Sequence, residues 1–168
     1  GNFPLFIKPN TGSSSYGAMK LNSIEELDFN FKSKVDEYII QEFIDWDEIT
    51  VDCYVSTSDV LIGCVPRYRV KVKDGKSVVS KTFKNSLITS ACKEILSLIK
   101  YRGVCNLQFF IKEHEYKLIE INPRFAAGGL SISTEAGINI PELMIMDNAG
   151  MLLHKLHDYN KNLKMFRY

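Results

Sequence analysis

Hydrophobic and polar residues alternate along much of the chain, which is the pattern expected of half-buried β-strands. Short runs of this kind, together with continuous apolar stretches, predict strands over residues 5–9, 38–44, 48–55, 59–66, 67–73, 77–83, 104–111 and 116–121. Turn residues such as Asp74 and Gly75 separate neighbouring runs. We therefore expect antiparallel hairpins rather than a parallel sheet.

Apolar residues recur at helical spacing in a few other places. The longest such segment runs from Asn85, a suitable N-cap, to about residue 100. Shorter helices are predicted after Ser23, over residues 130–136, and from Pro141 to about residue 149. The chain is therefore predicted to have an α+β fold, with antiparallel sheets flanked by helices.

The most informative stretch is the predicted strand that ends at residue 122. Glu120 and Asn122 are two residues apart in a strand, so both side chains project from the same face. A carboxylate beside an amide suits a hard cation, and Arg124, after Pro123, can hold a phosphate or carboxylate through two hydrogen bonds. An ordinary strand end with a structural Arg–Glu pair is the alternative.

A glycine- and serine-rich stretch follows the first strand. Residues 10–17 contain Gly12 and Gly17, and backbone N–H groups of such a loop can surround an anion. Lys8 lies directly before this loop, where its amine can reach a bound phosphate. The stretch has no P-loop or Rossmann spacing, so a solvated linker remains an alternative.

Other polar residues on the predicted strands also have two interpretations. Alternation over residues 67–73 places Arg67, Arg69, Lys71 and Lys73 on one face, as a solvated row or as a binding surface for an anionic substrate. Gln108 is expected near Glu120 across a hairpin, as a hydrogen-bonding residue or as a ligand.

Length and charge limit the functions that need consideration. The 168 residues are enough for a folded core, and 45% hydrophobic with 24% charged residues is an ordinary globular composition. A net charge of +1 argues against general nucleic-acid binding. No run approaches the roughly 18 apolar residues of a membrane span, so we expect no membrane partner and a cytoplasmic protein. The sequence leaves open whether the protein forms a homo-oligomer.

The four cysteines, Cys53, Cys64, Cys92 and Cys105, are widely spaced and contain no CxxC pair. Most have apolar or strand-like neighbours. We therefore expect buried free thiols rather than a zinc site or disulfides.

The order of these features resembles the ATP-grasp superfamily. Five features follow one another in the order found in that family. They are a strand with a lysine, a glycine-serine loop, Gln-Glu-Phe-Ile, Asn-Leu-Gln and Glu-Ile-Asn-Pro-Arg. The resemblance covers roughly residues 4–150 and is greatest for the short-form branch that is similar to carbamoyl-phosphate synthase. It implies an ATP-grasp fold whose N-terminal portion is missing from this chain.

The resemblance implies a set of nucleotide contacts. Lys8 would contact the ATP phosphates, the loop would close over them, the strand after residue 40 would bind adenine, and Glu48 would hold the ribose. The residues that would bind ATP are Lys8, Gly12, Ser13, Ser14, Gly17, Gln41, Glu42, Phe43, Ile44 and Glu48.

It also implies a metal site and a catalytic centre. Gln108, Glu120 and Asn122 match the family's Mg²⁺ (or Mn²⁺) ligands, and Arg124 acts with Lys8 at the transferred phosphate. The acceptor carboxylate would face the residues Arg67, Arg69, Gly128 and Gly129.

The implied activity is that of an ATP-dependent ligase. A carboxylate would attack the γ-phosphorus of ATP, and an amine or ammonia would displace phosphate from the resulting acyl phosphate. The expected organisation is a lid subdomain over residues 1–37, a large subdomain over 38–150 and a basic tail over 151–168. The small-molecule carboxylate and amine would need a missing N-terminal domain or partner subunit. The alternative is a non-catalytic nucleotide-binding or assembly module that requires a partner chain.

Overall fold

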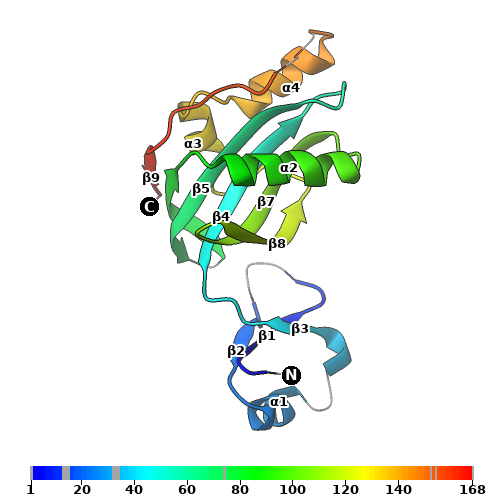
Figure 1. Cartoon of the computed structure of the whole chain (residues 1–168), viewed down its shortest axis with the longest axis vertical. Helices are drawn as coiled ribbons and strands as arrows, with labels where there is room; N and C mark the ends of the chain where they lie inside the picture. Colours follow the sequence, from blue (N-terminus) through cyan, green and yellow to red (C-terminus); the bar gives the residue numbers. More distant parts are fainter. Residues whose placement is uncertain are drawn as a thin grey trace. The chain divides into compact units, whose positions relative to one another are not determined.

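The computed structural model describes residues 2–12, 16–31, 35–73, 75–151, 153 and 155–167. The chain forms two compact units, Gly1–Asp45 and Trp46–Tyr168 (Figure 1). No helix among the described residues is long and apolar enough to cross a membrane.

The first unit is a small antiparallel sheet with one helix. The strands β1 (Leu5–Pro9), β2 (Met19–Leu21) and β3 (Tyr38–Glu42) lie in the order β2-β1-β3. The helix α1 (Ile24–Phe31) and a 3₁₀ turn, η1 (Val35–Glu37), connect β2 to β3. Ile7, Leu21 and Phe31 form the core.

The strand β3 pairs with β1 along its whole length. Leu5 lies opposite Glu42 and Pro9 lies opposite Tyr38. The organisation expected from the sequence has this strand in the large subdomain of residues 38–150. The hydrogen-bond register places it in the first unit instead.

The second unit is a six-stranded antiparallel sheet with the order β8-β7-β4-β5-β6-β9. Its strands are β4 (Asp47–Val55), β5 (Leu61–Lys73), β6 (Lys76–Thr82), β7 (Gly103–Lys112), β8 (Glu115–Asn122) and β9 (Lys164–Phe166). The predicted α+β fold with antiparallel sheets flanked by helices is thus confirmed.

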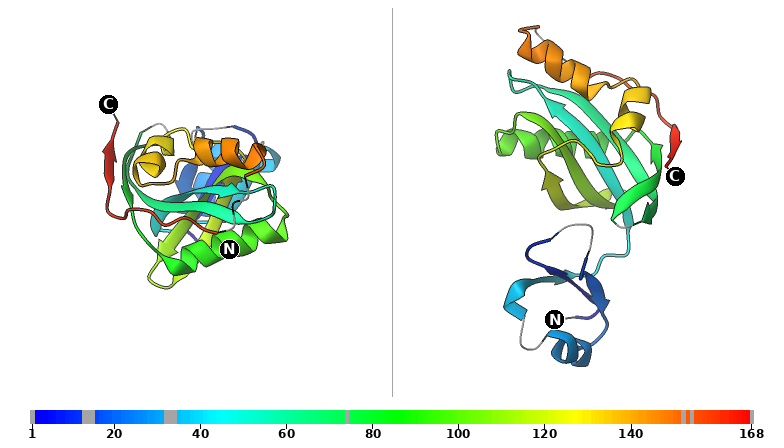
Figure 2. Two further views of the ribbon diagram at one scale, coloured as in Figure 1. Left: turned by 90° about the horizontal axis from the view of Figure 1, so that it is seen from above. Right: turned by 180° about the vertical axis from the view of Figure 1, so that it is seen from behind.

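Helices cover both faces of this sheet. Figure 2 shows α2 (Ser86–Leu98) on one face and α3 (Leu130–Glu135) and α4 (Ile140–Asn148) on the other. The side chain of Asn85 accepts a hydrogen bond from the Ile88 backbone N–H at 3.1 Å, so the predicted N-cap of α2 is confirmed. Because β4 and β5 bury side chains on both faces, each face has its own apolar core.

The cations predicted on one face of β5 do not form a continuous row. Register shifts with β6 occur between Arg69 and Lys71 and between Lys71 and Val72. Arg67 is buried, whereas Lys71 and Lys73 are exposed. The irregular register therefore interrupts the alternation on which the prediction depended.

The C-terminal region, predicted only as a basic tail, is joined to the second unit by backbone hydrogen bonds. His157 N–H donates to the Ile62 carbonyl at 2.9 Å, and Asn160 N–H donates to the Ala136 carbonyl at 2.8 Å. The strand β9 then pairs with β6. The chain therefore returns to the sheet after α4, as the red segment of Figure 1 shows.

Candidate functional site

A band of polar side chains lies on the face of the second sheet that also packs against α3. Alternation along β4 directs Glu48, Thr50 and Asp52 to this face. Thr50 lies opposite Gln108 of β7, and Gln108 lies opposite Glu120 of β8. The antiparallel register therefore brings together residues that are far apart in the sequence.

Gln108, Glu120, Asn122 and Arg124 form a chain of hydrogen bonds. Gln108 Nε2 and Asn122 Nδ2 both donate to Glu120 Oε1, each at 2.7 Å. Arg124 Nη2 donates to Asn122 Oδ1 at 3.2 Å. The expected proximity of Gln108 to Glu120 is present, and Glu120 and Asn122 share a face as their spacing predicts.

Arg69 connects this chain to Glu48. Its Nη1 donates to Glu48 Oε1 at 2.6 Å and to Gln108 Oε1 at 2.7 Å, and its Nη2 donates to the Gly75 carbonyl at 2.8 Å. The Arg69 side chain is only 8% exposed. Three hydrogen bonds and burial thus hold its guanidinium in place.

The two carboxylates of this network are electrostatically coupled. Burial raises the pKa of Glu48, the positive charge of Arg69 opposes this shift, and the negative charge of Glu120 adds to it. We refer to Glu48, Arg69, Gln108, Glu120, Asn122 and Arg124 together as the polar network. It contains two carboxylates, two guanidinium groups and two amides.

Arg67 lies beside this network but is bonded within the fold. Its Nε donates to Asp52 Oδ2 at 3.0 Å and its Nη2 donates to Asp52 Oδ1 at 3.4 Å. Ser133 of α3 also donates to Asp52 Oδ2, at 2.7 Å. The predicted contact of Arg67 with an acceptor carboxylate therefore remains a prediction, and it would require the guanidinium to leave or share Asp52.

The two loop glycines pack against arginines. A Cβ at Gly129 would overlap the Arg67 guanidinium, and a Cβ at Gly128 would lie 2.8 Å from Arg167 Nη1. Arg167 Nη1 also donates to the Ala127 carbonyl at 3.2 Å. Glycine is therefore required at 129 for close packing rather than for its backbone angles, since its φ of −126° suits any residue.

Sequence reasoning missed two of the residues that support this region. Ser133 and Arg167 contact it from α3 and from the end of the chain, 81 and 40 residues away from their respective partners Asp52 and Ala127. No local pattern indicates such contacts. Asp52, in contrast, lies on the same face of β4 as Glu48 by simple alternation.

The donor types in the polar network fit a hard divalent cation. Glu120 offers a carboxylate, and Gln108 and Asn122 offer amide oxygens, which are the ligand types that Mg²⁺ prefers. In this structure both amide NH₂ groups point to Glu120, while the amide oxygens accept from Arg69 and Arg124. All three oxygens can face one ion only if both amide groups turn.

The predicted phosphate and adenine contacts belong to the first unit. Lys8 lies on β1 opposite Ile39, and Gln41 and Glu42 lie on β3. Gly12 and Gly17 have positive φ angles of 145° and 73°, which suit glycine. Phe43 N–H donates to the Pro4 carbonyl at 3.3 Å, and Ile44 is partly buried. Ser13 and Ser14 lie outside the described residues.

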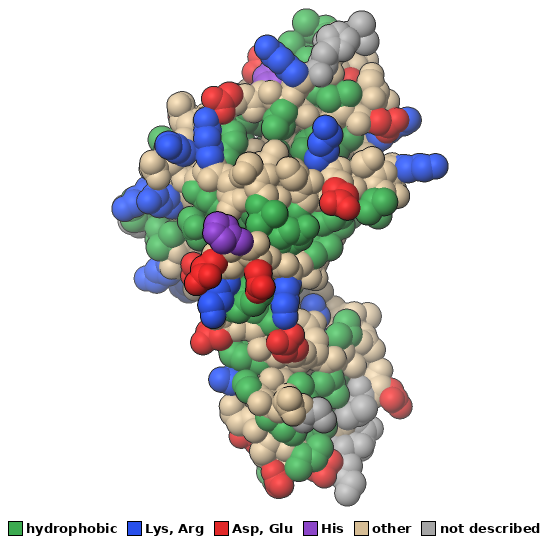
Figure 3. All heavy atoms as spheres, in the orientation of Figure 1, with side chains coloured by type: hydrophobic (Ala, Val, Ile, Leu, Met, Phe, Trp, Pro, Cys, Tyr) green, Lys and Arg blue, Asp and Glu red, His purple; other side chains and the backbone are tan. Residues whose placement is uncertain are grey.

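Charged side chains do not gather into one large patch on the face drawn in Figure 3, where acidic and basic groups of the second unit are interspersed. This distribution agrees with the net charge of +1. It gives no support to a general nucleic-acid surface on that face.

Comparison with known families gives a match over most of the chain. Residues 34–167 match the family described as "ATP-grasp in the biosynthetic pathway with Ter operon". The matched range includes the complete polar network and the C-terminal strand.

Similar curated proteins are large chains of carbamoyl phosphate synthase. That of Methanospirillum hungatei is 28% identical over 171 residues, which covers 92% of this chain and 16% of the relative. That of Methanosarcina mazei is 25% identical over 135 residues, which covers 74% of this chain and 13% of the relative. The chain thus spans only a small part of the length of these relatives.

Solved structures with the same fold include two nucleotide complexes. Biotin carboxylase from Campylobacter jejuni, in a beta-gamma-ATP complex, has a TM-score of 0.79 at 17% identity and covers 96% of this chain and 40% of that one. N5-carboxyaminoimidazole synthetase from Staphylococcus aureus, complexed with ADP, has a TM-score of 0.79 at 16% identity and covers 99% of this chain and 46% of that one.

Proposed function

The chain belongs to the ATP-grasp family, and from this premise we propose that it is the ATP-binding portion of a ligase that joins a carboxylate to an amine or ammonia. The observation that carries the proposal is the hydrogen-bonded set Gln108, Glu120 and Asn122 beside Arg124. It combines oxygen donors for a cation with a guanidinium for a phosphate. The names of the similar synthases and synthetases support a carboxylate-activating reaction.

Glu120, Gln108 and Asn122 are the proposed ligands of Mg²⁺ or Mn²⁺. When bound, such an ion neutralises negative charge on ATP phosphates. Glu120 contributes the formal charge, and the two amides contribute neutral oxygens after they turn from their present partners. Arg69 is a positioning residue in this proposal, because it holds both Glu48 and Gln108.

The proposed reaction is phosphoryl transfer followed by acyl transfer. An oxygen of the acceptor carboxylate attacks the γ-phosphorus, the bond from phosphorus to the β–γ bridging oxygen breaks, and ADP leaves. The amine then attacks the carbonyl carbon of the acyl phosphate, phosphate leaves, and the amine loses a proton. Arg124 and Lys8 stabilise the negative charge on the transferred group.

The remaining assignments complete the proposed site. Glu48 would accept hydrogen bonds from the ribose hydroxyls, and the segment Gln41–Ile44 would bind adenine through its backbone. Arg69 and the loop Gly128–Gly129 would face the acceptor carboxylate, together with Arg67 if its pairing with Asp52 changes. Because the chain spans 13–16% of its curated relatives, a further domain or a partner chain is proposed to complete the acceptor site.

Calorimetric titration with ATP, with and without Mg²⁺, tests the metal assignment. Glu120→Gln should weaken Mg²⁺-dependent ATP binding at least about tenfold, which corresponds to roughly 1.4 kcal/mol, because it removes the only formal charge among the ligands. Glu94→Gln, on the exposed surface of α2, is the matched control and should bind as the unmodified chain does. Equal affinities of the two variants in Mg²⁺ would contradict the assignment.

An assay of ADP release tests the ligase chemistry separately. The 168-residue chain and any longer form of the protein are each supplied with ATP, Mg²⁺, candidate carboxylates and ammonia. Release that depends on a carboxylate supports the reaction proposed above. Tight MgATP binding without release, for every carboxylate and amine tried, would instead indicate a non-catalytic nucleotide-binding module.

A further inference from the structure

All four cysteines of the chain lie in one core, although they are widely spaced in the sequence. Cys53 of β4 lies opposite Cys64 of β5 and opposite Cys105 of β7. Directly opposite residues in an antiparallel sheet point to the same face. Three thiols therefore form a row across three strands, and Cys92 of α2 packs onto this row from above the sheet.

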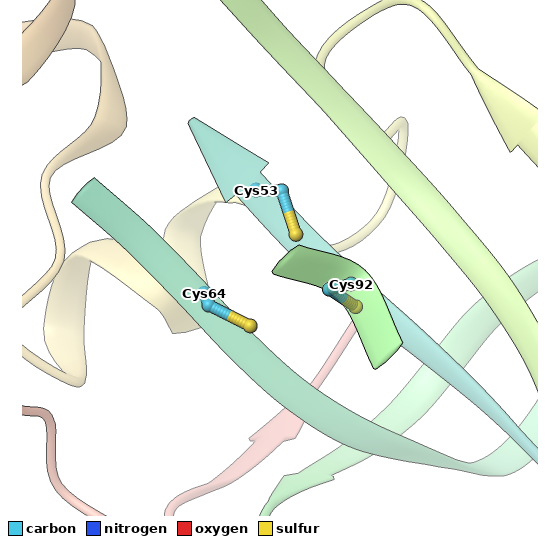
Figure 4. Close-up of side chains that lie close together, drawn as sticks. All are labelled: Cys53, Cys64 and Cys92. Atoms are coloured by element: carbon cyan, nitrogen blue, oxygen red, sulfur yellow. The ribbon is translucent and has the colours of Figure 1, made fainter. Parts of the chain in front are cut away.

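Three of the sulfur atoms converge on one point. The Sγ atoms of Cys53, Cys64 and Cys92 all lie within 4.8 Å of one another. Figure 4 shows the three side chains close together, coming from β4, β5 and α2. Each residue is at most 1% exposed, and all four cysteines are free thiols.

This arrangement is close to that of sulfurs around a bound metal ion. A zinc–sulfur bond is about 2.3 Å, so three sulfurs around one ion lie about 4 Å apart. The sulfurs of Cys53, Cys64 and Cys92 need to move by less than about 1 Å to reach that separation, which rotation about χ1 can provide. Cys105 lies opposite Cys53 but on the side of β4 away from Cys64, so it is a neighbour of the three sulfurs and not one of the group.

Packing alone does not explain why the sulfurs meet. A buried free cysteine behaves as a small apolar residue, and the surrounding positions Val51, Val55 and Ile88 show that this core accepts ordinary aliphatic side chains.

A metal ion also fits the burial better than a disulfide does. An oxidant must reach side chains that are at most 1% exposed, whereas an ion can bind while the chain folds around it. Thiolate ligands select soft ions over the hard cations that oxygen ligands prefer. The thiol cluster is therefore chemically distinct from the oxygen donors around Glu120.

We propose that Cys53, Cys64 and Cys92 bind one thiophilic metal ion, of the class that includes Zn²⁺, Cd²⁺ and Cu⁺. The ion joins α2 to β4 and β5. These strands carry Glu48 and Arg69 toward the opposite face of the sheet. Binding at the thiols therefore stabilises the sheet that supports the polar network.

The test is refolding of the whole 168-residue chain from denaturant under reducing conditions, with Cd²⁺ as the probe. We expect one Cd²⁺ to remain bound per chain after gel filtration, with an ultraviolet sulfur-to-cadmium absorption band. The midpoint of unfolding should move to higher denaturant concentration as Cd²⁺ increases. Cys64→Ala and Cys92→Ala should each weaken binding at least about a hundredfold.

Two further measurements keep this test decisive. Glu120→Gln, at the oxygen donors, should retain the absorption band, which separates this proposal from the magnesium assignment. If the alanine variants do not fold, as judged by circular dichroism, cadmium NMR of the unmodified chain counts the bound sulfurs from the chemical shift. A chain that refolds natively without retaining Cd²⁺, a shift typical of oxygen ligands, or unchanged affinity in both folded alanine variants would each overturn the proposal.

Discussion

Gly129→Ala is the substitution for which the structure gives the most specific expectation. Its backbone has φ −126° and ψ −13°, so alanine is not strained there. The added methyl group would overlap the Nη2, Cζ and Nε atoms of Arg67. The guanidinium, which is 3% exposed, must therefore move, because little free space surrounds it.

The size of the effect follows from what Arg67 holds. Its Nε and Nη2 are 3.0 and 3.4 Å from the two carboxylate oxygens of Asp52, which is itself buried. Breaking a buried ion pair costs about 3–5 kcal/mol because one charge is left uncompensated. Ser133 still donates to Asp52, and the arginine can keep part of its contact. We therefore expect Gly129→Ala to lower the free energy of unfolding by about 2–4 kcal/mol.

Equilibrium unfolding in urea measures this change, and a second genetic background identifies its cause. In a chain that carries Arg67→Met and Asp52→Asn together, the same Gly129→Ala change should cost less than about 1 kcal/mol, since the charged pair is absent. Ala127→Ser, at an exposed neighbouring position, is the control for the loop itself. A cost below about 1 kcal/mol in the unmodified background, or an equal cost in both backgrounds, would refute the reasoning.

Two further predictions concern carboxyl groups. Glu120→Gln removes a negative charge that raises the pKa of Glu48. In this variant the pKa of Glu48, measured by NMR titration, should fall toward its ordinary value. An unchanged pKa would show that the two groups are not coupled. Burial alone would raise the pKa of Asp147, but hydrogen bonds from the Thr57 N–H at 2.8 Å and from the hydroxyls of Tyr54 and Thr57 hold it below its usual range. This carboxylate contributes stability above the unfolded pKa of about 3.9 and loses it as the pH falls through the lower folded pKa. Asp147→Asn should therefore cost about 2 kcal/mol at neutral pH and less in acid, and a cost that does not change with pH would contradict this.

Features that depend on short-range geometry could be predicted from the sequence. The period of two in a strand places Glu120 and Asn122 on one face, and the hairpin over residues 112–115 brings Gln108 close to Glu120. Asn85 is the N-cap of α2 for the same local reason. Their positions follow from a few neighbouring residues, so no knowledge of the rest of the fold was needed. Gln108 and Glu120 are directly opposite only because the register shifts between Gln108 and Phe109, which the sequence does not indicate.

Features that depend on register and on distant segments could not be predicted. Alternation left Arg67 either in a solvated row or at an anionic substrate. Its ion pair with the buried Asp52 on the neighbouring strand is revealed only by the register of β4 and β5. The apolar residues Leu118, Ile119 and Ile121 are typical of a buried strand, yet β8 is an edge strand in which Leu118 is 43% exposed. The three-residue strand β9 has too few positions to show any periodicity.

The convergence of the cysteines is the clearest example of this limit. Their wide spacing without a CxxC pair and their apolar neighbours led to the expectation of buried free thiols, which is confirmed, but gave no sign that the thiols lie close together. Cys53 meets Cys64 and Cys105 because β4 lies between β5 and β7, which is a property of the strand order. A thiol group assembled from two strands and a helix has no spacing that can be recognised in the sequence.

The two arginines of the polar network are held so differently that they cannot have the same role. Arg69 is 8% exposed and donates three hydrogen bonds of 2.6–2.8 Å. Burial raises the pKa of Glu48 and the charge of Arg69 opposes that shift, so moving Arg69 would remove the positive partner of this carboxylate. Arg124 is exposed, and its hydrogen bonds to Asn122 and to the Phe125 carbonyl are 3.2 and 3.3 Å long. Releasing Arg124 therefore costs less than releasing Arg69, because longer and solvated hydrogen bonds contribute less. This difference supports Arg124 as the group that turns toward a phosphate, and Arg69 as the group that keeps Gln108 and Glu48 in position while it does so.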